Sequence, residues 1–451
     1  MKSAALPGFR DFYPDDLALR SHIFATWRAV AARYGFEEYD GPPLEPLDLY
    51  TQKSGAEIVG QLYNFEDKGG RQVALRPEMT PTLARMVAAR ANGLKKPIRW
   101  FAIPQLFRYE RQQRGRLREH FQLNCDLIGE AGPLGDAEVI ALAVDVMRAF
   151  GLGPADVRVR LADRRALNAL LGAAGIPDSG LPEAYQAVDK IERMSRNELA
   201  AQLRDGGFGP QQIDAVFRVA TLRGLEAVQQ EVAALGAPAA SIQPLVQVVS
   251  ALDAMGLSEF VEVDCSIVRG LAYYTGTVFE LFDAGRTLRA IAGGGRYDQL
   301  LGALGGVDLP ALGFGMGDVV LAELLKDRGL VTRTPTGVQV FVAAVTEEDL
   351  PHVLRLVHEV RDAGIAVEYA LGSQPLGKQL KLADARGARI AVVIGPDDRA
   401  RGEVMLKDLE VKAQRPVRRE AAAAEIRSAL TGGGERTRQG AGQGPDLRQS
   451  T

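Results

Sequence analysis

A long helical segment interrupts the strand-forming part of this chain, and it constrains the fold more than any other feature. Residues 164–256 are rich in Ala, Leu, Gln, Arg and Glu, with apolar residues at helical spacing and Gly or Pro between the runs. Strand patterns flank this segment, at 98–103 and 121–128 before it and at 260–268, 277–282 and 288–291 after it. We therefore expect one sheet built from residues 1–163 and 257–327, with a helical insertion at 164–256.

The flanking segments predict an α+β domain with a mainly antiparallel sheet. Apolar residues recur at helical spacing over residues 19–34, which predicts an amphipathic helix against the sheet. The runs 98–103 and 121–128 predict an antiparallel hairpin around an arginine-rich turn. The glycines at 293–295 predict a tight turn, because glycine adopts backbone conformations that other residues avoid.

A second, smaller domain is expected at the C-terminal end. The polar, helix-breaking stretch 328–337 suits a linker, and residues 338–430 follow as a domain. Strand and helix patterns alternate there, which is typical of a parallel α/β sheet: strands 338–345, 366–371 and 389–394, and helices 348–363 and 376–386. Residues 431–451 have almost no apolar content, so we expect a disordered tail.

Composition and charge exclude several classes of protein. The 451 residues are 46% hydrophobic and 25% charged with a net charge of -3, which favours a globular chain with a sizeable core. The near-neutral charge excludes a histone-like protein or one held on a membrane by bulk charge. No apolar run approaches the ~18 residues of a membrane span. The spacing of Cys125 and Cys265 suits neither a disulfide framework nor a zinc ribbon. We therefore expect a cytoplasmic protein with no metal site of its own. We also expect no membrane partner.

Five arginines fall between residues 108 and 118, against one carboxylate near the start of that run. A guanidinium group can bind two phosphate oxygens at once, and it keeps its charge at any physiological pH. This cluster therefore suits a nucleotide or a nucleic-acid backbone. A solvated basic turn is the bland alternative, and charge alone favours it.

The neighbouring residues argue against a basic turn that is merely solvated. Gln122 and Asp126 follow the arginines on a predicted strand, and their even separation places both side chains on one face. Acceptor groups would then face a pocket bordered by arginines. Such a pocket suits a polar ligand beside a polyphosphate, which is the arrangement needed to join an amino acid to ATP.

With these residues in view, the sequence resembles the histidyl-tRNA synthetases, a family of class II aminoacyl-tRNA synthetases, over nearly its whole length. Residues 107–118 resemble the second motif of that class, and 267–280 and 292–298 resemble two signatures of the histidine enzymes. The resemblance implies that histidine reacts with ATP, accompanied by Mg²⁺, to give histidyl-adenylate, and is then transferred to the 3′ end of tRNA(His). It implies that Arg108 and Arg269 are catalytic and bind ATP, and that Glu110 lies beside the adenine.

The same resemblance assigns the histidine-binding residues: Glu78, Thr80, Gln122, Asp126, Tyr273 and Tyr274. Taken alone, the tyrosine pair would more often be core aromatics of a strand. Because adjacent strand residues face opposite sides, we expect one of the pair in the core and assign the ligand role to Tyr274.

Further partners follow from the resemblance. Residues 41–43 resemble the first class II motif, which implies a homodimer, and 338–430 resemble the anticodon-binding domain of this synthetase group. Arg114 and Arg116 are expected to contact the acceptor end of the tRNA.

One departure keeps an alternative open. The third class II motif carries an arginine for the γ-phosphate of ATP, and Val320 stands at that position. Losing a charged hydrogen bond to phosphate removes about 1.5 to 3 kcal/mol of binding unless another basic group compensates. The alternative is therefore a synthetase-like regulatory protein of histidine biosynthesis that does not charge tRNA. A synthetase for glycine, proline or threonine would explain the architecture but not residues 269–274.

Overall fold

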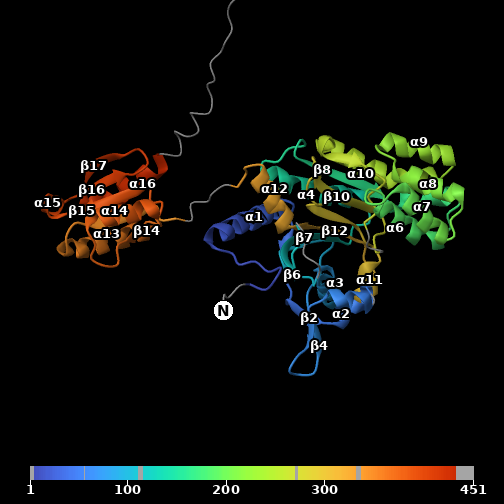
Figure 1. Ribbon diagram of the computed structural model, residues 1–451, viewed down its shortest axis with the longest axis horizontal. Coiled ribbons are helices and arrows are strands. Elements are labelled where there is room, and N and C mark those ends of the chain that lie inside the picture. The colour runs from blue at the N-terminus through green and yellow to red at the C-terminus, as the bar shows by residue number, and fades with distance from the viewer. Residues whose placement is uncertain (1–4, 55, 110–114, 270–272, 332–336, 433–451) are drawn as a thin grey trace, which may run out of the picture. The chain divides into compact units, whose positions relative to one another are not determined.

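The computed structural model describes residues 5–54, 56–109, 115–269, 273–331 and 337–432. The chain forms two compact units, residues 1–332 and 333–451 (Figure 1). The expected linker and tail lie partly outside the described residues. Among the helices that the structure describes, none is long and apolar enough to cross a membrane.

The first unit is built on a nine-stranded sheet in the order β1-β5-β7-β12-β11-β10-β8-β9, with β6 paired to β7. Its central pairs are antiparallel, whereas β1 with β5 and β8 with β9 are parallel. The strands are β1 Glu37–Glu38, β5 Ile98–Ala102, β6 Gln105–Phe107, β7 Glu119–Ile128, β8 Val157–Asp163, β9 Val261–Val263, β10 Thr277–Asp283, β11 Ala292–Arg296 and β12 Ala311–Gly317.

Strand alternation gives this sheet a helix-covered face and an open face. On β7, Leu123, Cys125 and Leu127 are buried in the main hydrophobic cluster. The helices beside this sheet are α1 Pro14–Arg33, α4 Pro133–Ala149 and α12 Asp318–Asp327 (Figure 1). The alternate residues of β7 and β12 point to the other face, which is the face that the cavity described below occupies.

The segment between β8 and β9 is helical, as the sequence predicts, but it does not form a core of its own. Its apolar residues belong to the same hydrophobic cluster as the sheet, and α10 packs against α4. The elements are α5 Arg164–Ala173, η2 Asp178–Gly180, α6 Leu181–Asp189, α7 Arg196–Asp205, α8 Pro210–Ala220, α9 Leu225–Leu235, η3 Ala239–Ile242, α10 Gln243–Ala254 and η4 Ser258–Phe260. The division at residues 164 and 256 is therefore one of secondary structure within a single compact unit.

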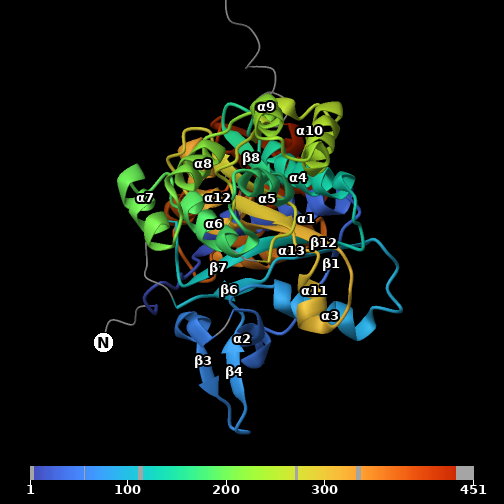
Figure 2. The same ribbon diagram turned by 90° about the vertical axis from the view of Figure 1, so that its right-hand side faces the viewer.

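A small lobe carries the chain between β1 and β5. Its three-stranded sheet has the order β2-β4-β3, and Figure 2 shows β3 and β4 beside α2. The elements are β2 Leu44–Pro46, α2 Asp48–Ser54, η1 Ala56–Gln61, β3 Asn64–Glu66, β4 Gln72–Leu75 and α3 Thr80–Arg90. α11 Leu300–Gly305 packs against α3.

Three sequence-based assignments were wrong. The predicted turn at 293–295 is the middle of β11, and the predicted strand at 288–291 is not one. The predicted strand 260–268 shortens to β9, after which Asp264 accepts hydrogen bonds from the backbone and hydroxyl of Ser266 and bends the chain. Glycine signals a turn locally, but close packing against a strand also demands it.

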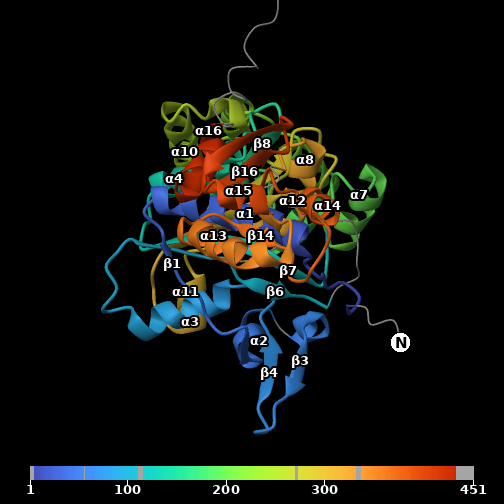
Figure 3. The ribbon, with the colours of Figure 1, turned by 90° about the vertical axis from the view of Figure 1, so that its left-hand side faces the viewer.

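The C-terminal unit is a mixed sheet in the order β14-β13-β15-β16-β17. The predicted parallel part is present, but β16 and β17 extend it with antiparallel strands (Figure 3). Val340 and Val342 face the cluster that includes α13 and α16, whereas Phe341 and Ala343 face α14. The elements are β13 Val340–Ala344, η5 Glu347–Asp349, α13 Leu350–Asp362, β14 Val367–Tyr369, α14 Leu376–Ala385, β15 Ile390–Ile394, α15 Pro396–Ala400, β16 Glu403–Asp408, β17 Ala413–Arg418, η6 Arg419–Ala421 and α16 Ala422–Gly432.

Candidate active site

Alternate glycines on β11 and β12 form the floor of the open face. The register pairs Gly293 with Gly315 and Gly295 with Gly313. A Cβ atom on Gly293 would lie 1.4 Å from Nη1 of Arg269, and one on Gly313 would lie 2.3 Å from Oδ1 of Asp126. These glycines are therefore required because functional side chains lie directly on the strands.

Arg269 lies over this floor in a restricted conformation. Its φ of 47° is in the left-handed region, which costs a non-glycine residue on the order of 1 kcal/mol. Its Nη1 is 3.5 Å from Oε1 of Glu280, and its guanidinium is 5.6 Å from the Tyr274 ring centroid. The buried Nε has no hydrogen-bond partner among the described residues. Strain and an unsatisfied buried donor together indicate a side chain held for a ligand.

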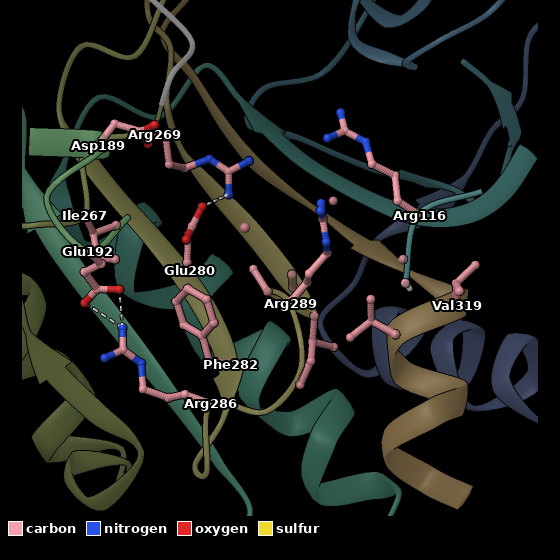
Figure 4. A pocket seen from close by; sticks show the side chains of 18 of the residues that line it. Arg116, Asp189, Glu192, Ile267, Arg269, Glu280, Phe282, Arg286, Arg289 and Val319 are labelled. Atoms are coloured by element: carbon pink, nitrogen blue, oxygen red, sulfur yellow. Dashed lines mark hydrogen bonds and ion pairs between the residues drawn. The ribbon is translucent and has the colours of Figure 1, made fainter. Parts of the chain in front are cut away.

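A cavity of about 940 Å³ opens beside Arg269. Four of the predicted site residues line it: Arg108, Arg116, Gln122 and Arg269. Figure 4 shows the guanidinium groups of Arg116 and Arg269 directed toward the same space. Burial, together with the positive charges of Arg108, Arg10 and Arg116, lowers the pKa of His120 in this wall to about 3. Because this imidazole is neutral, the wall owes its positive charge to arginine.

Arg108 connects the cavity to the segment that carries Glu78 and Thr80. Its Nε donates a hydrogen bond to the carbonyl of Pro77 at 3.0 Å, and its backbone N–H donates to Arg118 at 2.9 Å. Thr80 begins α3, and Glu78 is close enough to Tyr273 to influence its pKa. Glu110 and Arg114 lie outside the described residues.

A second group of predicted residues gathers around Asp126. Asp126 and Gln122 both lie against glycines of β12, so the prediction that they share one face is confirmed. The Tyr297 hydroxyl donates a hydrogen bond to Asp126, and the Tyr273 ring lies 6.0 Å from that of Tyr297. Burial raises the pKa of Asp126 to about 7, and the hydrogen bond from Tyr297 opposes this rise. A ligand N–H placed here would stabilise the carboxylate.

The reason given for choosing between the two tyrosines was wrong. Tyr273 and Tyr274 lie in a turn before β10 and not in a strand, so they do not face opposite sides, and their ring centroids are 4.7 Å apart. Tyr274 is buried beneath Arg269, while Tyr273 is less buried and lies beside Tyr297. The geometry therefore favours Tyr273 for direct ligand contact and Tyr274 for support of Arg269.

Sequence reasoning did not assign roles to several residues that the structure brings to the site. Glu280 and Arg289 line the cavity, and Tyr297 holds Asp126. Tyr39 is also near this group: its buried hydroxyl has no hydrogen-bond partner among the described residues, and burial and then the charge of Asp126 are the largest causes that raise its pKa. The alternating glycines at 293, 295, 313 and 315 were the available signal for this face.

Arg296, in the second histidine-like signature, has a structural position. Its guanidinium is 1% exposed, lies 2.7 Å from Oδ2 of Asp136, and donates to the carbonyls of Glu130 and Gly132 at 2.8 and 3.0 Å. It ties the end of β11 to the start of α4.

Replacing Arg296 by methionine is expected to lower the free energy of unfolding by about 3 to 5 kcal/mol, because it leaves a buried carboxylate without its partner. Burial already raises the pKa of Asp136 to about 6, and Arg296 opposes this rise. Without the arginine the carboxyl protonates more readily in the folded state, so stability falls as pH rises. Urea denaturation should therefore show a larger loss at pH 8 than at pH 5, and Asp136→Asn added to the variant should remove that pH dependence. Equal losses at both pH values would contradict the assignment.

Comparisons with known proteins identify the family of each unit. The family model described as histidyl-tRNA synthetase matches residues 8–318, and a model described as anticodon binding domain matches 339–429. A histidine--tRNA ligase of Opitutus terrae is 46% identical over 428 residues, covering 94% of this chain and 98% of that protein.

Solved structures support the same fold. The crystal structure of histidyl-tRNA synthetase from Nostoc has a TM-score of 0.81 at 26% identity, covering 95% of this chain and 100% of that one. An ATP phosphoribosyltransferase regulatory subunit/histidyl-tRNA synthetase from Bacillus halodurans has a TM-score of 0.72 at 23% identity, covering 88% and 98%, and this likeness concerns the fold alone. The predicted α+β class with a C-terminal α/β domain is confirmed. The chain belongs to the histidyl-tRNA synthetase family.

Proposed function

We propose that this chain activates histidine with ATP and transfers the histidyl group to the 3′ end of tRNA(His). The observation that carries the proposal is Arg269, held over Gly293 between an arginine-lined cavity and the buried Asp126 group. A fixed guanidinium at the junction of two subsites can stabilise charge that develops when groups bound in each of them react.

ATP occupies the cavity in this proposal. Arg108 and Arg269 bind the α-phosphate, and the histidine carboxylate attacks its phosphorus as pyrophosphate leaves. Arg116, predicted to contact the tRNA, lines this cavity and so is also available to the phosphates. Glu110 is proposed beside the adenine from the family motif alone.

Histidine occupies the space beside Asp126, Tyr273 and Tyr297. An imidazole N–H can donate to Asp126, whose pKa of about 7 leaves it ready to become charged against a donor. Gln122, Glu78 and Thr80 are proposed around the carboxylate and amino group of the amino acid. Tyr274 supports Arg269 from below.

Mg²⁺ fits this cavity as an ion that arrives with ATP. The carboxylates of Asp189, Glu192 and Glu280 line the cavity, but the described residues contain no cluster of three or more metal-ligating side chains. Mg²⁺ is commonly bound by substrate phosphates with one or two carboxylates. When bound, the ion would neutralise phosphate charge. Of the three carboxylates, Glu280 is the one that pairs with Arg269.

The remaining partners rest on family membership. The match of residues 339–429 to an anticodon binding domain supports tRNA as the partner of the C-terminal unit. A homodimer is proposed from the first class II motif at residues 41–43, and contact of Arg114 and Arg116 with the acceptor end from the second.

The proposal predicts histidine-dependent exchange of pyrophosphate into ATP by the purified full chain. Exchange should occur with histidine and not with glycine, proline or threonine, because the Asp126 site selects an imidazole. Histidine binding without exchange would refute activation and favour the regulatory alternative that Val320 motivates. Exchange without charging of tRNA(His) would confine the activity to the first step.

A further inference from the structure

The cavity lacks an arginine at the position where its family carries one. Val320 stands in the first turn of α12, is 7% exposed and lines the cavity. A valine offers no hydrogen bond to a phosphate. Either the terminal phosphate of ATP goes without this contact, or another cation reaches the same corner from a different element.

The segment before β11 is placed to supply that cation. β11 pairs with β12 in antiparallel fashion, and the N–H of Gly317 donates to the carbonyl of Ile291 at 3.1 Å. Residues just before β11 therefore lie opposite the start of α12. Arg289, which is far from Val320 in sequence, reaches the same end of the cavity by this route.

The side chains of Val320 and Arg289 both lie close to Gly115. A Cβ atom built on Gly115 would lie 3.3 Å from Cγ2 of Val320 and 3.7 Å from Cδ of Arg289. The stem of Arg289 and the side chain of Val320 thus border the same glycine. Figure 4 shows its guanidinium directed toward the space that the guanidinium groups of Arg116 and Arg269 also face.

Three other arginines of the cavity are held by contacts away from Val320. Arg286 forms two hydrogen bonds of 2.7 Å with the carboxylate of Glu192, and Arg108 donates to Pro77. Arg269 is beside Glu280 over the glycine floor. Arg289 is exposed and lines the cavity at the end where Val320 stands.

We propose that Arg289 binds the γ-phosphate of ATP in place of the arginine that Val320 replaces. The γ-phosphate contact then comes from the segment before β11 and not from helix α12. This inference rests on the proposed ATP site. It explains how a chain without that motif arginine retains the grip on pyrophosphate that activation requires.

The test compares the binding of ATP and ADP, which differ by the γ-phosphate, to the full chain with Mg²⁺ and without histidine, so that no adenylate forms. Isothermal titration should show that the wild-type chain prefers ATP. In Arg289→Ala, the affinity for ATP should fall roughly ten- to a hundredfold while the affinity for ADP changes less than about twofold. The unchanged ADP affinity also shows that the variant is folded.

Arg196→Ala is the control, since it removes an exposed arginine that pairs with Asp214 and does not line the cavity. It should leave the ratio of ATP to ADP affinity unchanged. A retained ratio in Arg289→Ala, or a ratio that falls equally in Arg196→Ala, overturns the inference while leaving the ATP site intact. Equal binding of ATP and ADP by the wild-type chain overturns it as well, and binding of neither refutes the proposed function itself.

Discussion

Replacing Arg269 by alanine should reduce histidyl-adenylate formation, measured as histidine-dependent exchange, by about a hundred- to a thousandfold. The guanidinium is fixed beside Glu280 and over Gly293, so it meets the developing charge without reorganising. The fold should survive. Arginine already bears the cost of a left-handed φ of 47°, and alanine bears a similar one.

The measurement is pyrophosphate exchange together with thermal unfolding. Arg196→Ala is the matched control, because Arg196 is an exposed arginine of α7 paired with Asp214 at the surface. It should change neither quantity appreciably. Near-normal exchange in Arg269→Ala would refute the catalytic role, and exchange lost together with folding would refute the claim that the role is confined to catalysis.

Elements with a strong apolar period were predictable from sequence, while those shaped by long-range contacts were not. The helix around Trp27 and the strand carrying Gln122 and Asp126 follow from local spacing, because each buries one regular face. Glycines at 293–295 indicated a turn, because the sequence does not reveal that Arg269 and Tyr274 come to lie on that strand. β6, with only three residues, depends on pairing with β7 and has too little local pattern to be recognised.

In the candidate site, too, residues in local motifs were predictable, while those placed by long-range contacts were not. The resemblance identified Arg108, Gln122 and Arg269, and the structure places all three on one cavity. It could identify Val320 as a departure but not its compensation, since Arg289 reaches that corner only through the pairing of β11 with β12. When a residue on one strand's segment takes over a role from a residue beside the paired strand, the sequence of the motif does not show it. The choice between Tyr273 and Tyr274 was wrong in its reasoning for a related cause, because a turn stands where a strand was expected.

Replacing Gly293 by alanine should reduce exchange nearly as much as removing Arg269, by about a hundredfold. A methyl group there would lie 1.4 Å from Nη1 of Arg269, so the guanidinium must leave its position. The atom displaced is the end of a flexible side chain, and the backbone of β11 can stay in place. We therefore expect a change in the free energy of unfolding of about 1 kcal/mol or less, which separates this effect from loss of the fold.

The double variant decides whether Gly293 acts through Arg269. Adding Gly293→Ala to Arg269→Ala should cost no further activity, because the group that the methyl displaces is already gone. Gly172→Ala in α5 is the matched control, since a Cβ there meets nothing within 4 Å, and it should leave exchange unchanged and stability equal or slightly higher. A further loss in the double variant would show that the glycine serves another purpose, such as the approach of substrate to the strand. Non-additivity would instead establish that the glycine on β11 exists to make room for one arginine.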